Sequence, residues 1–499
     1  MKKIIIYILF QWSMVALLAQ GDAQLFVHAP VLAPDDTLIL YMQKDRITEP
    51  FRNPIQMLAA DNKDGVYSFN IDDLDEHTWI SMGLSFQKRG QTPFFTILRE
   101  FLLQQGDSVH VFLKPKKGSF KPSEVGYDGN VPIINDNWEG MFTGRGASKY
   151  DALWQVKLLG EEDYRMKAMD SLSSVYPTNQ FDLLYKLQDR ALSLLLNYKH
   201  TWSSEIYSLL ERQVKGYYGD FIGRQMHHLH FYRENSGAVD SALRIELQRY
   251  LDQGGYDLGH TRDKDILSPK YMDYLLKYSM ASFRSLNNGK MDVEKCYYYI
   301  KNFIKPLKVR DRVIASFLLN WFQFSPNEEV LSDALSLIKE PYSLEKVSIL
   351  KGLLEGEIGY SFSLPDVNGR YHKAEEYRGK IVFIDFWFAS CLACHHYMRD
   401  VVGPIKELYK DNPNVVFITI STDNYETFKR MLNKQDFLPK SGVHLFTENK
   451  GYKHPMIEYY QITAYPYPLL YGKDYRLVNG DFNIRTREGL KEAIERALK

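Results

Sequence analysis

Residues 381–394 read Ile-Val-Phe-Ile-Asp-Phe-Trp-Phe-Ala-Ser-Cys-Leu-Ala-Cys, and this stretch decides the fold of the C-terminal part of the chain. Its first six residues form a short apolar run, which predicts a buried strand. A helix is predicted from about residue 391 to residue 408, so Cys391 and Cys394 share its first turn. Cα atoms three residues apart on a helix fall within the ~4.4–6.8 Å that a disulfide requires. The two thiols can therefore close and reopen with little backbone movement.

The two cysteines are predicted to have different roles. Unpaired N–H groups and the positive end of the helix dipole lie beside Cys391 and favour its thiolate. Because the thiolate is the attacking species, we expect Cys391 to be the exposed nucleophile and Cys394 the buried resolving thiol. Two alternatives stay open, a structural disulfide and a zinc site. Zinc would need two further ligands, and although His395 and His396 adjoin Cys394, the sequence has no second cysteine pair.

The segments around this motif alternate between strands and helices. A second apolar run at 415–420 predicts another buried strand, and residues 469–471 and 476–478 predict a hairpin. Helices are predicted around 427–433 and 456–460, and an amphipathic helix at 487–498 closes the chain. This order of elements is typical of an α/β domain.

Four motifs in this order resemble the TlpA/ResA-like family of exported thioredoxin-fold proteins, over residues 358–499. They are an entry hairpin at 362–369, a Tyr-Arg-Gly-Lys turn at 377–380, the active-site stretch at 384–394, and a segment at 459–466 that ends in the proline of the fold. The resemblance implies an α/β thioredoxin-like fold and thiol-disulfide exchange without a dissolved cofactor.

The same resemblance implies roles for further residues. Asp385 matches a buried carboxylate that passes protons to the resolving thiol; the alternative is a hydrogen-bonded polar residue at a strand end. Trp387 would pack under the active-site helix. Pro466 would be cis and face the disulfide, with Pro468 as the alternative, and the backbone of Tyr465 would pair with an extended substrate.

This chain departs from the family pattern around the cysteines. Ser390 stands where Trp is frequent, and Leu392 and Ala393 replace the common Gly-Pro dipeptide. Because that dipeptide tunes the relative stability of dithiol and disulfide, the sequence does not give the reduction potential. Tyr397 stands where the ResA-like branch often has an acid, which leaves the second proton-handling group unassigned.

The regions before residue 358 have different patterns. Residues 24–140 alternate with a period of two between turns, which predicts a β-sandwich-like domain with a Gly106-Asp107 turn. Residues 142–148 look like a connector; a phosphate-binding loop at Gly144 and Gly146 would lack the accompanying Lys-Ser/Thr. Residues 145–355 have helical periodicity and predict an all-α region. We therefore expect a multidomain chain: β-sandwich, helical region and thioredoxin-like domain.

Two groups of residues in the helical region could suggest a reactive thiol or a metal site, but their surroundings favour a structural role. Cys296 falls on an apolar stripe with Val293, Ile300, Phe303 and Leu307, so we expect a buried structural thiol. The histidines at 227, 228 and 230 have no Cys, Asp or Glu at a supporting spacing, so we predict no metal site there.

The N-terminus predicts export. Two lysines, an apolar run from residue 4 to 19 and small residues before a cut after Ala23 make residues 1–23 a signal peptide, with an uncleaved anchor as the alternative. No later segment offers ~20 continuous apolar residues, so no stable membrane span is expected in the mature chain. The predicted location is periplasmic.

The composition excludes some partners. The chain of 499 residues has 62 basic and 62 acidic side chains, which gives no electrostatic case for binding nucleic acid. The expected partners are exported proteins that contain disulfides and a membrane-linked thiol electron donor. The alternatives are a binding or assembly module with a non-catalytic thioredoxin fold, and a thiol peroxidase. The peroxidase pattern Pro-x-x-x-Thr-x-x-Cys would need Pro and Thr where Ile384 and Phe388 stand.

Overall fold

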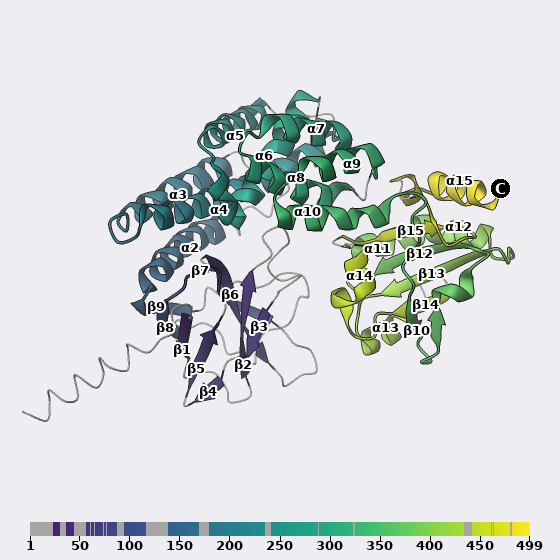
Figure 1. Cartoon of the computed structure of the whole chain (residues 1–499), viewed down its shortest axis with the longest axis horizontal. Coiled ribbons are helices and arrows are strands. Elements are labelled where there is room, and N and C mark those ends of the chain that lie inside the picture. The colour runs from purple at the N-terminus through teal and green to yellow at the C-terminus, as the bar shows by residue number, and fades with distance from the viewer. Residues whose placement is uncertain are drawn as a thin grey trace, which may run out of the picture. The chain divides into compact units, whose positions relative to one another are not determined.

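The computed structural model (Figure 1) describes most of the chain. The described residues are 23–29, 36–43, 56–59, 61–63, 65–72, 74–75, 77–86, 94–115, 138–168, 179–234, 241–287, 289–322, 325–433, 442–460, 462, 464–479 and 482–499. The predicted signal peptide lies outside them except for Ala23, which is the first residue of strand β1. The chain divides into two compact units: Met1–Gly259 with Asp265–Tyr278, and His260–Lys264 with Ser279–Lys499. This division runs through the helical region, whereas the predicted domain limits lie at its ends.

The first unit begins with a β-sandwich, as predicted. One sheet has the order β4-β5-β1-β8-β9 and the other β3-β2-β6-β7. The strands are β1 (Ala23–His28), β2 (Asp36–Gln43), β3 (Gln56–Ala59), β4 (Asp61–Lys63), β5 (Val66–Ile71), β6 (Thr78–Phe86), β7 (Phe94–Leu103), β8 (Ser108–Pro115) and β9 (Trp138–Arg145). Alternate residues such as Leu25 and Val27 are buried in one core cluster with Leu38 and Leu40 of the other sheet. The period of two in the sequence therefore marks the inner faces of the two sheets.

The predicted connector at 142–148 is wrong for its first half. β9 runs to Arg145 and pairs with β8 along its whole length, and helix α2 (Ala147–Ala168) begins two residues later. A Cβ on Gly144 would lie 2.2 Å from the Ser108 carbonyl oxygen, and one on Gly146 would lie 2.1 Å from Asp107 Oδ1. The two glycines allow close approach of these segments, and the carboxylate beside Gly146 is the wrong charge for a phosphate-binding loop.

Nine α-helices, beginning with α2, carry the described chain from the sandwich to the C-terminal domain. They are α2, α3 (Asn179–Leu196), α4 (Ser204–Glu234), α5 (Ser241–Gly259), α6 (Pro269–Leu286), α7 (Val293–Phe303), α8 (Leu307–Trp321), α9 (Glu328–Leu337) and α10 (Pro341–Ser348) among the described residues. Proline stands at the start of several of them because its missing N–H costs nothing in the first turn. No described helix is long and apolar enough to cross a membrane.

The apolar stripe predicted around Cys296 is shorter than expected. Cys296 and Ile300 are fully buried on α7, which confirms a buried structural position for this thiol. Leu307 is 59% exposed, because Pro306 separates α7 from α8 and Leu307 starts the new helix. The side chains of the histidines at 227, 228 and 230 lie outside the described part of the chain.

The C-terminal domain has the α/β fold that the sequence predicts. Its sheet has the order β14-β13-β12-β15-β16, and a separate hairpin β10-β11 precedes it. The elements are β10 (Ser363–Pro365), β11 (Tyr371–Lys373), β12 (Ile381–Trp387), α11 (Leu392–Tyr397), α12 (Gly403–Leu408), β13 (Val415–Ser421), α13 (Tyr425–Leu432), β14 (Val443–Phe446), α14 (Pro455–Tyr459), β15 (Tyr467–Tyr471), β16 (Leu477–Asn479) and α15 (Arg487–Leu498). The predicted helix after Cys391 is present, with a π-helical turn at Met398–Val402 between α11 and α12.

The central strand β12 places the site. It pairs in parallel with β13 and antiparallel with β15, and all seven of its residues are buried. Successive side chains point to opposite faces of the sheet, so Asp385 shares a face with Phe383 and Trp387. Those two residues belong to the same core cluster as Cys391 and Cys394. Asp385 therefore lies on the face of β12 that the active-site helix covers.

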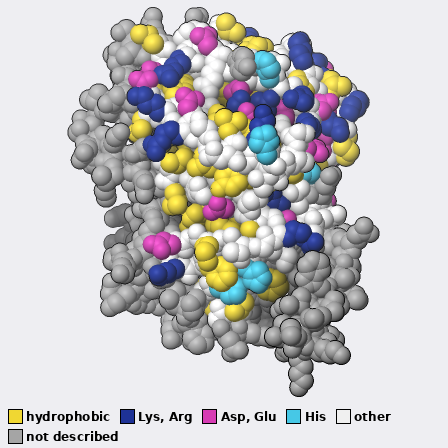
Figure 2. Space-filling view, turned by 90° about the vertical axis from the view of Figure 1, so that its left-hand side faces the viewer, with side chains coloured by type: hydrophobic (Ala, Val, Ile, Leu, Met, Phe, Trp, Pro, Cys, Tyr) yellow, Lys and Arg dark blue, Asp and Glu magenta, His cyan; other side chains and the backbone are white. Residues whose placement is uncertain are grey.

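The described surface carries charges of both signs. In the face of Figure 2, Lys and Arg side chains are interspersed with Asp and Glu. This pattern agrees with the zero formal net charge of the chain.

Candidate functional site

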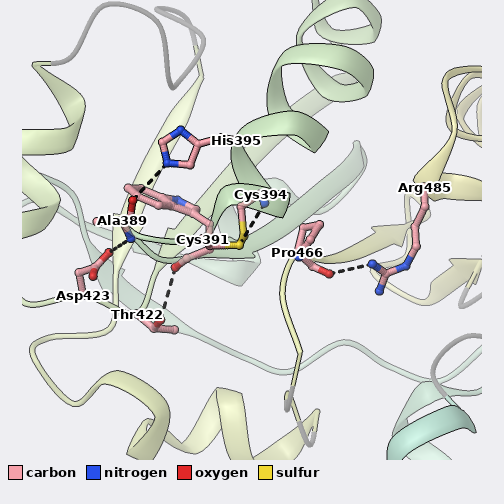
Figure 3. Close-up of a disulfide and its surroundings, with 9 residues drawn as sticks. Ala389, Cys391, Cys394, His395, Thr422, Asp423, Pro466 and Arg485 are labelled. Carbon is pink, nitrogen blue, oxygen red and sulfur yellow. Dashed lines mark hydrogen bonds between the residues drawn. A yellow bond between two sulfur atoms is a disulfide. The ribbon is translucent and has the colours of Figure 1, made fainter. Parts of the chain in front are cut away.

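The cysteine motif begins where β12 ends. The Cys391 N–H donates to the carbonyl of Phe388 at 3.0 Å, which turns the chain after the strand. Cys391 then occupies the N-cap position of α11, in extended backbone geometry. The Cys394 N–H donates to Cys391 Sγ at 3.0 Å, so the first cysteine caps the helix that carries the second (Figure 3). A donor aimed at this sulfur would stabilise a thiolate there after reduction.

Cys391 and Cys394 form a disulfide with a Cα–Cα distance of 5.2 Å. Cys391 retains 6% of its surface and Cys394 none. The expected asymmetry between the two sulfurs is present, but Cys391 is much less exposed than the sequence led us to expect. Its neighbours account for this, because both cysteines pack in one core cluster against which Phe388 and Tyr465 also lie. An attacking reagent therefore has access only to Cys391.

Asp385 is fully buried, and no other side chain hydrogen-bonds to its carboxylate oxygens among the described residues. Burial raises the pKa of Asp385 to about 8, partly offset by the charge of Arg485 and by backbone N–H groups of Phe386 and Tyr467. A carboxyl with this pKa can take up or release a proton near neutral pH.

The three predicted supporting residues lie around the motif. Trp387 is fully buried as the last residue of β12, in the core cluster of both cysteines. The Tyr465–Pro466 peptide bond is cis, while Pro468 lies within β15 opposite Asp385. The rings of Tyr465 and Phe388 meet edge to face with centroids 5.2 Å apart. Pro466 lies among the residues around the disulfide in Figure 3.

Sequence reasoning missed Asp423, which holds the loop before Cys391. Its Oδ2 accepts the N–H of Ala389 at 2.7 Å (Figure 3). The same oxygen accepts the hydroxyl of Ser421 at 2.9 Å. Burial raises the pKa of Asp423, and these two hydrogen bonds offset only part of that rise. The signal was present in the sequence: a polar Ser-Thr-Asp run follows an apolar strand that is parallel to β12, and carboxyl ends of parallel strands meet at one edge.

Sequence reasoning also missed Arg485, and it considered His395 only as a neighbour of Cys394 in the zinc alternative. Arg485 Nη1 donates to the carbonyl oxygen of Pro466 at 2.9 Å. His395 Nε2 donates to the carbonyl of Ala389 at 3.1 Å, so this nitrogen is engaged in fixing the active-site loop (Figure 3). No group of three or more His, Cys, Asp or Glu side chains in the described ranges is arranged to hold a metal ion.

Comparison with known proteins agrees with this geometry. The profile of a thioredoxin-like family matches residues 379–477, which include the cysteine motif, Asp385 and the cis-proline. The C-terminal domain is thioredoxin-like. This thioredoxin-like domain also accounts for the similarity to the thiol-disulfide oxidoreductase ResA of Geobacillus thermodenitrificans, which is 27% identical over 154 residues, 28% of this chain and 76% of that protein.

Solved structures are similar to part of this chain. The thioredoxin domain of a thiol-disulfide oxidoreductase from Bacteroides vulgatus is 19% identical, with a TM-score of 0.25, over 29% of this chain and 99% of that structure. A thioredoxin-like protein from Bacteroides caccae is 15% identical, with a TM-score of 0.32, over 52% of this chain and 94% of that structure.

Proposed function

We propose that the thioredoxin-like domain exchanges disulfides with other proteins through Cys391 and Cys394. The observation that carries this proposal is the disulfide itself: it caps the active-site helix, and only Cys391 has accessible surface. A buried structural disulfide would need neither this accessible sulfur nor a titratable carboxyl on the sheet face beneath the helix.

The exchange begins from the reduced pair. The Cys391 thiolate attacks one sulfur of a substrate disulfide, forms a mixed disulfide, and releases the other substrate sulfur as a thiolate that takes up a proton. The Cys394 thiolate then attacks the Cys391 sulfur and releases the second substrate thiol. The substrate gains two electrons and two protons, and the Cys391–Cys394 disulfide is restored.

Asp385 would assist the second step. Cys394 has no accessible surface, so its proton has no direct path to solvent. Asp385 lies on the face of β12 that shares a core cluster with Cys394, and its pKa of about 8 leaves it a fraction of carboxylate at neutral pH. In that form it accepts the Cys394 proton and so generates the resolving thiolate.

The cycle needs an external dithiol to reduce the protein again. We infer that exported proteins with disulfides are the substrates and that a membrane-linked thiol donor supplies the electrons, which places the protein in the periplasm. These proposals rest on the basic and apolar N-terminus and on the resemblance to exported thioredoxin-fold proteins.

Reduction of insulin disulfides by the full-length protein, with dithiothreitol as the electron source, tests the activity. The wild type is expected to accelerate precipitation of the insulin B chain, and Cys391→Ser is expected to reduce the rate to that of dithiothreitol alone. Cys296→Ser is the matched control, because this thiol is buried away from the motif, and it should behave as wild type. Equal rates for wild type and Cys391→Ser would favour a binding module instead.

Trapping identifies the substrates. Cys394→Ala removes the resolving thiol, so natural substrates are expected to remain covalently bound to Cys391 as adducts that dithiothreitol releases. The double variant Cys391→Ser/Cys394→Ala is the control and should hold none. An absence of adducts from a lysate that contains envelope proteins would contradict protein substrates.

A further inference from the structure

Arg485 contacts two parts of the candidate site that are otherwise separate. It ends the short helical turn Phe482–Arg485 that precedes α15. Its guanidinium donates to the carbonyl of cis-Pro466 at 2.9 Å, and Figure 3 shows the side chain extending toward this proline. Pro466 lies two residues before Pro468, which pairs with Asp385 across β15 and β12, so the guanidinium also lies near this buried carboxyl and its charge lowers the pKa of Asp385. One side chain thus binds the cis-proline loop and also influences the pKa of Asp385, the proposed proton acceptor.

The turn that carries Arg485 is fastened to the active-site helix. The hydroxyl of Tyr397 in α11 donates to the carbonyl of Ile484 at 2.7 Å. Tyr397 and Ile484 are both buried and belong to the core cluster of the two cysteines. This contact fixes the backbone beside Arg485 relative to α11, which Cys391 caps. The position from which the guanidinium extends toward Pro466 is therefore tied to the active-site helix.

We propose that Arg485 is a positioning residue that holds the cis-Pro466 loop in place for an extended substrate and keeps Asp385 able to act as a base. The proposal rests on the function proposed above. A carbonyl already bound by Arg485 gives the loop a defined conformation, while the neighbouring Tyr465 backbone is left for the substrate. A fixed positive charge near a buried carboxyl favours its ionised form.

The ionisable groups around this pair come from three elements. Tyr397 from α11, Tyr467 from β15 and Asp385 from β12 act on the charge of Arg485. Burial raises the pKa of both tyrosines, so each is neutral over the pH range in which the enzyme would be assayed. Arg485 thus carries a charge that stays fixed over this pH range. Its removal should raise the pKa of Asp385.

Three variants separate the two roles. Arg485→Met removes both the charge and the donor, Arg485→Gln removes the charge and is too short to reach the Pro466 carbonyl but stays polar, and Arg485→Lys keeps a charge. The substrates are insulin, which has a backbone for the cis-proline loop to pair with, and Ellman's reagent, which has none. Arg487→Met, an exposed arginine two residues away, is the control for general charge.

The expected results are specific. For Arg485→Met, the rate with insulin relative to Ellman's reagent should fall about five- to tenfold, the effect of losing one hydrogen bond that orders the loop. For Arg485→Met and Arg485→Gln, the pH profile of exchange should move up by about one unit, because the pKa of Asp385 rises further without the guanidinium. Arg485→Lys should restore the pH profile, and Arg487→Met should match wild type.

The outcomes distinguish this proposal from the function on which it rests. With an active wild type, an Arg485→Gln variant whose rate ratio and pH profile are both unchanged would overturn the role of Arg485. A wild type no faster than Cys391→Ser would instead overturn the proposed function. Should Arg485→Met fail to fold, the rate ratio and pH profile of Arg485→Gln still decide the question, because Gln loses the same charge and hydrogen bond but retains a polar side chain at this position. In an Asp385→Asn background, Arg485→Gln should no longer move the pH profile.

Discussion

Asp385 shows how a single residue links stability to activity. The carboxyl is wholly buried on the central strand, and burial raises its pKa to about 8. Folding therefore favours the protonated form, since the pKa of an Asp in an unfolded chain is about 3.9. The stability that the protonated form contributes is complete below pH ~4 and is lost as the pH rises through about 8. The ionisable carboxyl of Asp385 therefore lowers the free energy of unfolding near neutral pH.

We expect Asp385→Asn to stabilise the domain increasingly with pH. The Asn side chain does not ionise, so the difference in unfolding free energy between variant and wild type should grow by of the order of 2–3 kcal/mol from pH 5 to pH 7. Amide hydrogen exchange of β12 at the two pH values measures it. The resolving step should become slower in the same variant, because Cys394 loses its proton acceptor.

Asp474→Asn serves as the control, since this carboxyl is 66% exposed on the turn between β15 and β16. It should leave both the stability difference and the exchange rate unchanged. A pH-independent difference for Asp385→Asn would show that Asp385 does not titrate in this range.

At the scale of elements, the start of α2 is fixed to the turn between β7 and β8. Lys149 Nζ donates to Asp107 Oδ2 at 2.8 Å and to Gln104 Oε1 at 2.6 Å, and both charged side chains are buried. Burial raises the pKa of Asp107 and lowers that of Lys149, and their mutual attraction opposes both shifts. Removing one partner of such a pair strands a buried charge, so this contact holds the helix to the sandwich.

Gly146→Ala should destabilise the first unit by about 3 kcal/mol or more. Ala at φ +90 is strained by about 1 kcal/mol, and its Cβ would lie 2.1 Å from Asp107 Oδ1, which Lys149 holds in place. Gly106→Ala is the matched control. It has a similar φ of +80, but the nearest atom to its Cβ is 3.7 Å away, so only the strain should remain. Urea unfolding of the two variants compares them; similar losses would mean that Asp107 yields to the new methyl group.

At the scale of the whole molecule, the third cysteine reports on the integrity of the unit that contains the redox pair. Cys296 lies in the second compact unit and is fully buried on α7. Burial raises its pKa to about 12, so it carries almost no thiolate at neutral pH. Its chemistry is therefore separated from that of Cys391 by burial and by ionisation.

Counting reactive thiols tests this separation on the full-length protein. The native oxidised chain should react with no equivalent of a thiol reagent, the mildly reduced native chain with one, at the accessible Cys391, and the reduced unfolded chain with three, the total in the sequence. Fast labelling of Cys296 in the native chain would show that α7 opens readily. Cys296→Ser should remove the third equivalent without changing insulin reduction.

Local patterns in the sequence predicted much of the C-terminal domain. The buried strand at 381–386, the helix after Cys391, the hairpin at 469–478 and the terminal helix all follow from apolar periodicity over a few residues, and the cis bond at Pro466 followed from the family resemblance. Such features depend on neighbours in the chain. The same reasoning failed at residues 142–145, where two glycines suggested a connector, because the pairing of β9 with β8 depends on a segment some thirty residues away.

What the sequence by itself determined is the fold of the C-terminal domain and the cysteine pair, while the family resemblance implied the buried carboxyl at Asp385. Only the tertiary structure decided that Cys391 is nearly covered, that Asp423 holds the loop before it, and that Arg485 reaches the cis-proline. The physical reason is range: helices, strands and caps are set by residues within a turn or two of one another. Accessibility, hydrogen bonds between distant loops and the pKa of a buried group exist only once those segments have packed together.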